Sequence, residues 1–457
     1  MKIVVIGGGP GGYVAALKAA ILGADVTVVE KGKVGGTCLN VGCIPTKALI
    51  ASSEALEIIN KANKYGFNIE GEVKTDFDAI MNRKQKVVTQ LVKGVEFLFE
   101  SKGVKLVRGC AKLVSKNQIE VSKEDGNKEI IEADKIILAT GSVPVVPRLF
   151  PYDGKKVITS DEVLSLEKIP QSMIIVGGGP IGCEIGQFFN TLGTKVQIVE
   201  MVDHLIPFED EDVAKQLQRS FKKNKIKFNV KNGIAKVDIK DDKVQAVLQS
   251  GKELEAEIML VCVGRRAYTE GLGLEELGIE TERGRVIVNE KMETSIEGIY
   301  AIGDIVNSPA LAHVGSKEGT VAVENALGKN KKMDYKAVPR CVFTDPEVAS
   351  VGITEKEAKE QGIEYKIGKF DFRGLGKAKA MDKIEGFVKV VADMQGKIIG
   401  AVIIGAHATD LLGEFTLAVH LGLTTEQVGD VIHPHPTLSE AVMEAVHDVE
   451  KQSVHSV

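Results

Sequence analysis

Two cysteines near the N-terminus have a spacing and a setting that suit redox chemistry. Cys38 and Cys43 are separated by four residues in the segment GGTCLNVGCIPTK (residues 35–47). A short-range disulfide in an otherwise reducing compartment is usually catalytic. A helix that starts beside a cysteine lowers the pKa of its thiol and favours the reactive thiolate. We therefore predict a dithiol–disulfide pair, although two cysteines at this spacing can also be buried as small apolar side chains.

A candidate acid–base group lies near the C-terminus, in HPHPTLSE (residues 433–440). His435 is followed five residues later by Glu440, at the start of a helix expected over 438–449. A histidine oriented by a carboxylate is suited to proton transfer at neutral pH. We expect His433 to be structural. The same is expected of His204, His407, His420, His447 and His455.

The elements that would position these groups include an internal repeat. Residues 3–30 and 174–200 each read as an apolar β-branched run, a glycine turn, an amphipathic helical stretch and a second run that ends on glutamate. This is the pattern of a βαβ unit. The matched residues are Gly7, Gly9, Gly12 and Glu30 in the first copy, and Gly177, Gly179, Gly182 and Glu200 in the second.

The repeated spacing predicts two dinucleotide sites. The first glycine makes a tight turn, the second lets the backbone approach a pyrophosphate, and the third lets helix and strand pack closely. The free N–H groups of the helix then hold phosphate, and the glutamate accepts a ribose hydroxyl. No arginine follows Glu200 before Arg219, so a ribose 2′-phosphate would meet carboxylate rather than cation. The second site is therefore predicted to take NAD.

Composition excludes several other classes of protein. The chain has 457 residues, of which 44% are hydrophobic and 26% charged, with a net charge of −5. That length suggests about three domains, and the charge gives no reason to expect nucleic acid or an anionic membrane. No stretch reaches the roughly 18 apolar residues that a membrane span needs. Glycines from Gly7 interrupt the first apolar run, so we expect a cytoplasmic protein without a signal peptide.

Further motifs extend the pattern along the whole chain. Besides the cysteine, glycine and histidine segments, the sequence contains ATGS (139–142), GGGPIGCE (177–184), VGRR (263–266), AIGD (301–304) and LAH (311–313). In this combination the chain resembles the FAD-dependent pyridine nucleotide–disulfide oxidoreductases. The resemblance implies an α/β fold with two Rossmann-like dinucleotide-binding domains and a C-terminal α+β dimerisation domain.

The resemblance also implies domain limits. The FAD domain would cover 1–142, the NAD domain 143–265, a central domain that completes the FAD site 266–336, and the dimer interface domain 337–457.

Residue roles follow from the same resemblance. The catalytic residues would be Cys38, Cys43, Lys47, Glu184, His435 and Glu440. The FAD site would comprise Gly7, Gly9, Gly12, Glu30, Gly36, Thr37, Lys47, Ala111, Thr140, Gly141, Ser142, Asp304, Ala310, Leu311, Ala312 and His313. The NAD site would comprise Gly177, Gly179, Gly182, Glu200, Ile234 and Gly264. No metal is expected.

The implied reaction is the reoxidation of protein-bound dihydrolipoyl groups. Electrons would pass from the substrate through the cysteine pair and one tightly bound FAD per subunit to NAD. The substrate thiolate would attack Cys38, expected to be the more exposed sulfur, and His435 would serve the partner subunit of a homodimer. The partners would be lipoyl domains of 2-oxo acid dehydrogenase complexes or of the glycine cleavage system.

Three alternatives make different demands on the sequence. A glutathione reductase would need a basic NADP site, which Glu200 opposes, and a mercuric reductase would need C-terminal cysteines, which the tail KQSVHSV lacks. A flavoprotein that serves only as a scaffold would be expected to have lost a reactive group, and all of them are present. Asp345 stands where many relatives have histidine, and its role is open.

Overall fold

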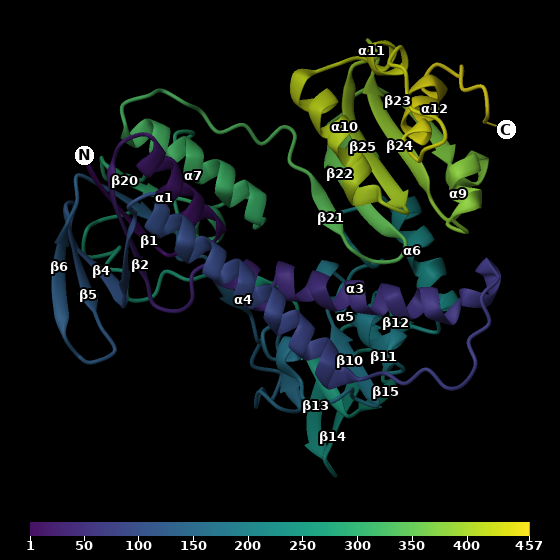
Figure 1. Cartoon of the computed structure of the whole chain (residues 1–457), viewed down its shortest axis with the longest axis horizontal. Helices are drawn as coiled ribbons and strands as arrows, with labels where there is room; N and C mark the ends of the chain where they lie inside the picture. The colour runs from purple at the N-terminus through teal and green to yellow at the C-terminus, as the bar shows by residue number, and fades with distance from the viewer. Residues whose placement is uncertain (457) are drawn as a thin grey trace.

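The computed structural model describes residues 1–456, and three five-stranded sheets organise this part of the chain (Figure 1). Two of these sheets are parallel and lie in the N-terminal two thirds of the chain. The third sheet is antiparallel and lies near the C-terminus, at the upper right of Figure 1. The predicted repeat is therefore present as two units with the same strand pattern.

The first parallel sheet has the strand order β20-β7-β1-β2-β3. Its strands are β1 (Lys2–Ile6), β2 (Asp25–Glu30), β3 (Lys105–Arg108), β7 (Lys135–Leu138) and β20 (Ile299–Ala301). The central strand β1 leads through the glycine turn into α1 (Pro10–Ile21). The segment expected to complete the FAD site contributes β20 to this sheet and packs α7 (Ala312–Ala326) against α1.

The second parallel sheet repeats the arrangement with the order β12-β11-β10-β16-β9. Its strands are β9 (Val157–Ile158), β10 (Ser172–Val176), β11 (Lys195–Val199), β12 (Lys227–Asn229) and β16 (Ile258–Val261). Here β10 leads through the second glycine turn into α5 (Pro180–Thr191). In both units the first strand of the repeat is central, so the two glycine turns lie at equivalent edges of their sheets.

Three helices lie between β2 and β3, and the first two of them contain the cysteines. They are α2 (Gly36–Val41), α3 (Cys43–Asn60) and α4 (Phe77–Ser101), with a short 3-10 turn, η1 (Ala62–Tyr65), after α3. Helix α3 packs against α4 and against α5 of the second unit. Leu49 of α3 is buried in the apolar core of that second unit. The redox helix is thereby fixed between the two nucleotide units.

The C-terminal sheet has the order β21-β22-β25-β24-β23. Its strands are β21 (Arg340–Val342), β22 (Glu347–Gly352), β23 (Tyr365–Asp371), β24 (Phe387–Asp393) and β25 (Ile398–Gly405). Helix α10 (Ala408–Leu421) packs on β22 and β25, and α12 (Glu440–Asp448) packs on β23. The helix expected over 438–449 is therefore slightly shorter, and Glu440 is its first residue.

Smaller elements connect the three sheets. A β8–β17 ribbon (Ser142–Pro144 with Arg265–Ala267) joins the two ends of the second unit, and β18 (Thr281–Glu282) pairs with β19 (Arg285–Val286). Two three-stranded sheets comprise β4 (Cys110–Ser115), β5 (Gln118–Ser122) and β6 (Lys128–Glu132), and β13 (Ile234–Lys240), β14 (Lys243–Leu248) and β15 (Glu253–Ala256). The remaining helices are α6 (Glu211–Lys223), α8 (Glu355–Glu360), α9 (Gly376–Ala380) and α11 (Thr425–Gly429), with 3-10 turns η2 (Glu162–Ser165), η3 (Gly303–Ile305) and η4 (Phe372–Gly374). Among residues 1–456, no helix has the length and apolar character to cross a membrane.

Candidate active site

The two cysteines lie where α2 gives way to α3. Gly42 separates the helices, and Cys43 is the first residue of α3. Both cysteines are free thiols in this structure, and each affects the pKa of the other. As whole residues, Cys43 is exposed and Cys38 is half-buried, whereas the Cys43 sulfur is the more deeply buried of the two thiols. The expectation that Cys38 has the more exposed sulfur therefore stays a prediction.

The environment divides the two thiols into a donor and a thiolate. The hydrogen bond from Cys38 lowers the pKa of Cys43 to about 7, desolvation opposes this shift, and Lys47 reinforces it. The same hydrogen bond, followed by burial, raises the pKa of Cys38 far above its usual range. Because the two thiols share a hydrogen bond, the loss of the first proton is a property of the pair as a whole. After that loss, the negative charge lies on Cys43. Cys43 is thus the stabilised thiolate of the reduced pair.

This division predicts selective alkylation of the reduced, flavin-free protein. Carboxamidomethylation of Cys43 by iodoacetamide should rise with an apparent pKa of about 7, because only the thiolate reacts. Cys38 should stay unmodified over the same range. Peptide mass spectrometry at a series of pH values measures both rates. In Cys38→Ala protein, which lacks the thiol donor, the Cys43 profile should move to higher pH; an unchanged profile would show that the hydrogen bond is not the cause.

An ion pair stands one turn along α3 from Cys43. Lys47 Nζ lies 2.7 Å from Glu184 Oε2 on α5, although the two residues are 137 positions apart in the sequence. The Glu184 side chain is 5% exposed, so its charge needs a partner. Its other oxygen accepts the N–H of Phe343 at 2.9 Å, and the Lys47 ammonium lies 4.2 Å from the Phe343 ring centroid. The pair therefore joins the redox helix, the second unit and the C-terminal sheet.

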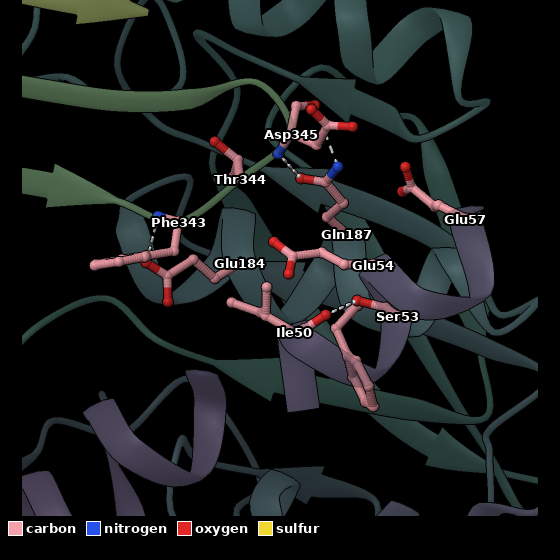
Figure 2. A pocket seen from close by; sticks show the side chains of 10 residues that line it. Ile50, Ser53, Glu54, Glu57, Glu184, Gln187, Phe343, Thr344 and Asp345 are labelled. Atoms are coloured by element: carbon pink, nitrogen blue, oxygen red, sulfur yellow. Dashed lines mark hydrogen bonds between the residues drawn. The ribbon is translucent and has the colours of Figure 1, made fainter. Parts of the chain in front are cut away.

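A pocket opens behind this ion pair, between α3, α5 and residues 343–345 (Figure 2). Glu54, Glu57 and Asp345 surround it. Burial and repulsion by neighbouring carboxylates raise the pKa of Glu54 and of Glu57. The Asp345 carboxylate, to which the sequence assigned no role, lies 2.7 Å from Lys383, and its backbone is bound by Gln187. The structure thus gives Asp345 a place in the contact between α5 and the C-terminal sheet.

The C-terminal acid–base pair is assembled within its own loop. His435 Nδ1 lies 2.8 Å from Glu440 Oε1, and Glu440 Oε2 accepts the N–H of Thr437 at 2.9 Å. Although partial burial acts in the opposite direction, these hydrogen bonds lower the pKa of Glu440. An Nδ1–H that donates to Glu440 leaves Nε2 as the basic nitrogen. The His435 side chain is 78% exposed, so Nε2 is open to a molecule outside this chain.

The neighbouring histidine has a different environment. The His433 side chain is 4% exposed, and its two ring nitrogens bond the Val431 carbonyl at 2.8 Å and Glu414 at 2.9 Å. With both nitrogens used, His433 has no free site for proton transfer. This contrast with His435 accords with the structural role expected for His433.

Both glycine turns have the geometry of a dinucleotide cradle. A Cβ on Gly12 would lie 1.9 Å from Gly7 O, and one on Gly182 would lie 2.0 Å from Gly177 O, so neither third glycine can carry a side chain. A Cβ on Gly179, by contrast, would meet nothing within 4 Å. The backbone of each turn is therefore bare on the side of the helix N-terminus, where a pyrophosphate would bind. The residues present fit two dinucleotides.

The two glutamates that follow the turns are also equivalent. Glu30 Oε2 accepts the N–H of Gly8 at 2.6 Å, and Glu200 Oε2 accepts the N–H of Gly178 at 2.7 Å. Each carboxylate is thereby held beside the first residues of its turn. The remaining acceptor positions of each carboxylate can serve ribose hydroxyls.

Some of the other residues assigned to the FAD site are connected by hydrogen bonds. The hydroxyl of Ser142 donates to the carboxylate of Asp304 in η3, and Arg265 Nε donates to the same Ser142 oxygen at 2.8 Å. Thr140 bonds the carbonyl of Tyr268 at 2.6 Å. Ala111 lies on β4, and Ala312 and His313 open α7. Of the residues assigned to NAD, Ile234 is buried in the apolar core beside the second sheet, and Gly264 lies between β16 and β17.

Two models of one protein family match most of the chain. Residues 1–319 match the family model for pyridine nucleotide-disulphide oxidoreductases, and residues 338–446 match the dimerisation domain of the same family. The chain belongs to this family. The predicted family, fold class and enzyme class are thereby confirmed, together with FAD and NAD as the cofactors that the family uses. The C-terminal domain that carries His435 is a dimerisation domain.

Individual relatives extend over the whole chain. A mitochondrial dihydrolipoyl dehydrogenase of Pisum sativum is 41% identical over 99% of this chain and 92% of its own length. A dihydrolipoyl dehydrogenase of Bacillus subtilis is 39% identical over the full length of both chains. Among solved structures, LpdA of Mycobacterium tuberculosis aligns with a TM-score of 0.92 at 29% identity, covering 98% of this chain and 99% of its own.

Proposed function

We propose that the chain is a dihydrolipoamide dehydrogenase. The observation that carries this proposal is the pair Cys38 and Cys43 at the start of α3, with the thiolate assigned to Cys43 beside Lys47. The full-length relatives that are named dihydrolipoyl dehydrogenases support it. The exposed His435–Glu440 pair supplies the proton acceptor that oxidation of a dithiol needs.

The proposed reaction begins with the base. His435 Nε2 takes a proton from one substrate thiol, and the thiolate attacks Cys38 of the oxidised pair, forming a mixed disulfide and releasing Cys43 as thiolate. The second substrate thiol then displaces Cys38, and its proton passes to the departing Cys38 sulfur, which becomes a neutral thiol. One substrate dithiol becomes a disulfide, and the enzyme disulfide becomes the Cys38 thiol and the Cys43 thiolate, with the other proton on His435. Bound FAD supplies the two-electron relay from this dithiol to NAD.

Each chain residue has a defined part in this scheme. Glu440 fixes the tautomer of His435 and stabilises the imidazolium that forms. Lys47 stabilises the Cys43 thiolate, and Glu184 holds Lys47 in place. Cys38 is the proposed point of attack because its high pKa returns it to a neutral thiol, which leaves Cys43 to carry the charge.

We further propose that two copies share each site. His435 lies in the dimerisation domain and is exposed within its own chain, so it would complete the site of the partner subunit. The proposed substrates are lipoyl domains of 2-oxo acid dehydrogenase complexes or of the glycine cleavage system. The domain limits at residues 142, 265 and 336 remain predictions that accompany this proposal.

The second dinucleotide site should prefer NAD to NADP by at least about 100-fold in kcat/KM. A 2′-phosphate would meet the Glu200 carboxylate, and a loss of about 2–3 kcal/mol from repulsion and missing hydrogen bonds corresponds to that ratio. Steady-state kinetics with both cofactors measure the ratio. Equal values of kcat/KM for NAD and NADP would show that Glu200 does not discriminate against the 2′-phosphate.

The function itself is tested by a comparison of substrates on the purified holoenzyme. NAD reduction by dihydrolipoamide should far exceed NADPH oxidation by glutathione disulfide or by mercuric ion. A higher rate with either of the latter would favour the corresponding reductase. A holoenzyme that binds FAD but turns over none of the three would favour the scaffold alternative.

A further inference from the structure

A fully buried carboxylate lies next to the turn that carries Asp304. Glu318, on α7, has 0% of its surface exposed. Its Oε2 accepts the N–H of Gly303 at 2.6 Å, and its Oε1 accepts the hydroxyl of Tyr335 at 2.7 Å. A buried carboxylate with two donors is a satisfied group, and removal of the carboxylate would leave the partly buried Gly303 N–H without this partner. The proposed reaction makes no use of Glu318.

The turn held by Glu318 begins at a glycine in the left-handed region. Gly303 has a φ of +72°, in the left-handed region, and it opens the 3-10 turn η3 that carries Asp304. The Asp304 carboxylate accepts the hydroxyl of Ser142, which in turn is bound by Arg265. The orientation of Asp304 therefore depends on Gly303 on one side and on Ser142 on the other.

The same face of α7 reaches the first glycine turn. A Cβ on Gly315 would lie 3.3 Å from Gly303 Cα, and one on Gly319 would lie 2.7 Å from Gly11 O. Gly315, Glu318 and Gly319 share one face because residues three and four apart are neighbours on a helix. Helix α7 thus contacts both the glycine turn of β1–α1 and the Asp304 turn. Glu318 is the one charged residue of these three.

Tyr335 connects this contact to another part of the chain. It lies in the segment between α7 and β21, which Figure 1 shows running from the first unit to the C-terminal sheet. Its hydroxyl donates to Glu318, and burial together with the neighbouring carboxylate raises the pKa of this phenol, so the hydroxyl stays a donor. Tyr335 thereby fixes the side chain of Glu318 from outside the helix.

We propose that Glu318 is a positioning residue for FAD. By accepting the Gly303 N–H it holds the Gly303–Asp304 turn, so that Asp304 is preset to receive the polar chain of FAD, and Tyr335 locks Glu318 in that orientation. The inference rests on the FAD role proposed for Asp304 but not on the identity of the thiol substrate. The test therefore measures FAD binding rather than turnover.

The experiment titrates flavin-free protein with FAD and follows flavin fluorescence. Glu318→Leu should raise the dissociation constant of FAD about tenfold or more, since a hydrogen bond to a charged group contributes roughly that factor. Glu318→Gln should stay within about threefold, because its amide oxygen can accept from Gly303 and its nitrogen can donate to Tyr335. Tyr335→Phe removes one hydrogen bond and should raise the dissociation constant of FAD by about three- to tenfold. This variant also tests the proposal if Glu318→Leu does not fold.

A matched control separates positioning from general loss of stability. Glu209 is another buried glutamate, 3% exposed, which accepts the hydroxyl of Ser350 beside the C-terminal sheet. Glu209→Leu should leave the dissociation constant of FAD within about threefold of the wild-type value. Weakening as large as that of Glu318→Leu in either Glu209→Leu or Glu318→Gln would overturn the proposal, as would unchanged FAD binding in both Glu318→Leu and Tyr335→Phe. If wild-type protein binds FAD but fails to oxidise dihydrolipoamide, only the proposed substrate falls.

Discussion

Replacement of Cys43 by serine should abolish turnover of dihydrolipoamide and also the long-wavelength charge-transfer band of the two-electron-reduced enzyme. The band needs a thiolate beside the flavin, and Cys43 is the thiol whose pKa is lowered, to about 7, by Cys38 and Lys47. Cys38→Ser should abolish turnover equally. It should, however, show such a band without any substrate, because Cys43 can then no longer be consumed in a disulfide.

Absorption spectra of the two oxidised and NADH-reduced holoenzymes measure this difference. The comparison is matched, since each variant replaces one sulfur by oxygen in the same pair. A permanent band in Cys43→Ser and none in Cys38→Ser would reverse the assignment. Loss of the band in both variants would show that neither thiolate interacts with the flavin.

Replacement of His435 by glutamine should lower the rate of dihydrolipoamide oxidation by about 10²–10⁴, the usual range for removal of a general base. Reduction of the flavin by NADH should stay nearly unchanged, because that half-reaction does not use the C-terminal base. Stopped-flow measurements follow the two half-reactions separately.

The tail offers a matched control for this variant. His455 Nδ1 lies 2.6 Å from Glu444, one turn of α12 beyond Glu440, and forms a second histidine–glutamate pair in which the histidine is exposed. His455→Gln should change the rate by less than about threefold, since the mechanism gives it no proton to transfer. A fall in the His455 variant as large as that in His435→Gln would show that the effect is not specific to the base.

Features encoded by local spacing were readable from the sequence. Each glycine turn lies with its strand, helix and glutamate inside one stretch of about 30 residues, so periodicity and spacing suffice. The pairing of His435 with Glu440 is local in the same sense, because only five residues separate them. The match of Lys47 with Glu184 spans 137 residues, and family resemblance rather than spacing predicted it.

Other features depend on packing that no local pattern reveals. Glu318 lies in the run AHVGSKEGTVAVENA, in which a charged residue reads as exposed, yet α1 and η3 bury it completely. The spacing of Gly315 and Gly319 was the available signal, since small residues four apart allow close contact of a helix face. The break at Gly42 likewise divides the cysteine segment into two helices, α2 and α3, which the spacing of the two cysteines does not reveal.

Cys38 and Cys43 of one chain are expected to act with His435 of the other, and a mixed dimer tests this sharing most directly. One subunit would carry Cys38→Ser and the other His435→Gln, with two affinity tags to purify the heterodimer. If the site is shared, one complete set remains, and dihydrolipoamide oxidation should be about half that of the wild-type dimer, although each variant homodimer is inactive. A mixed dimer as inactive as its parents would contradict the account, because it would show that each chain supplies its own base.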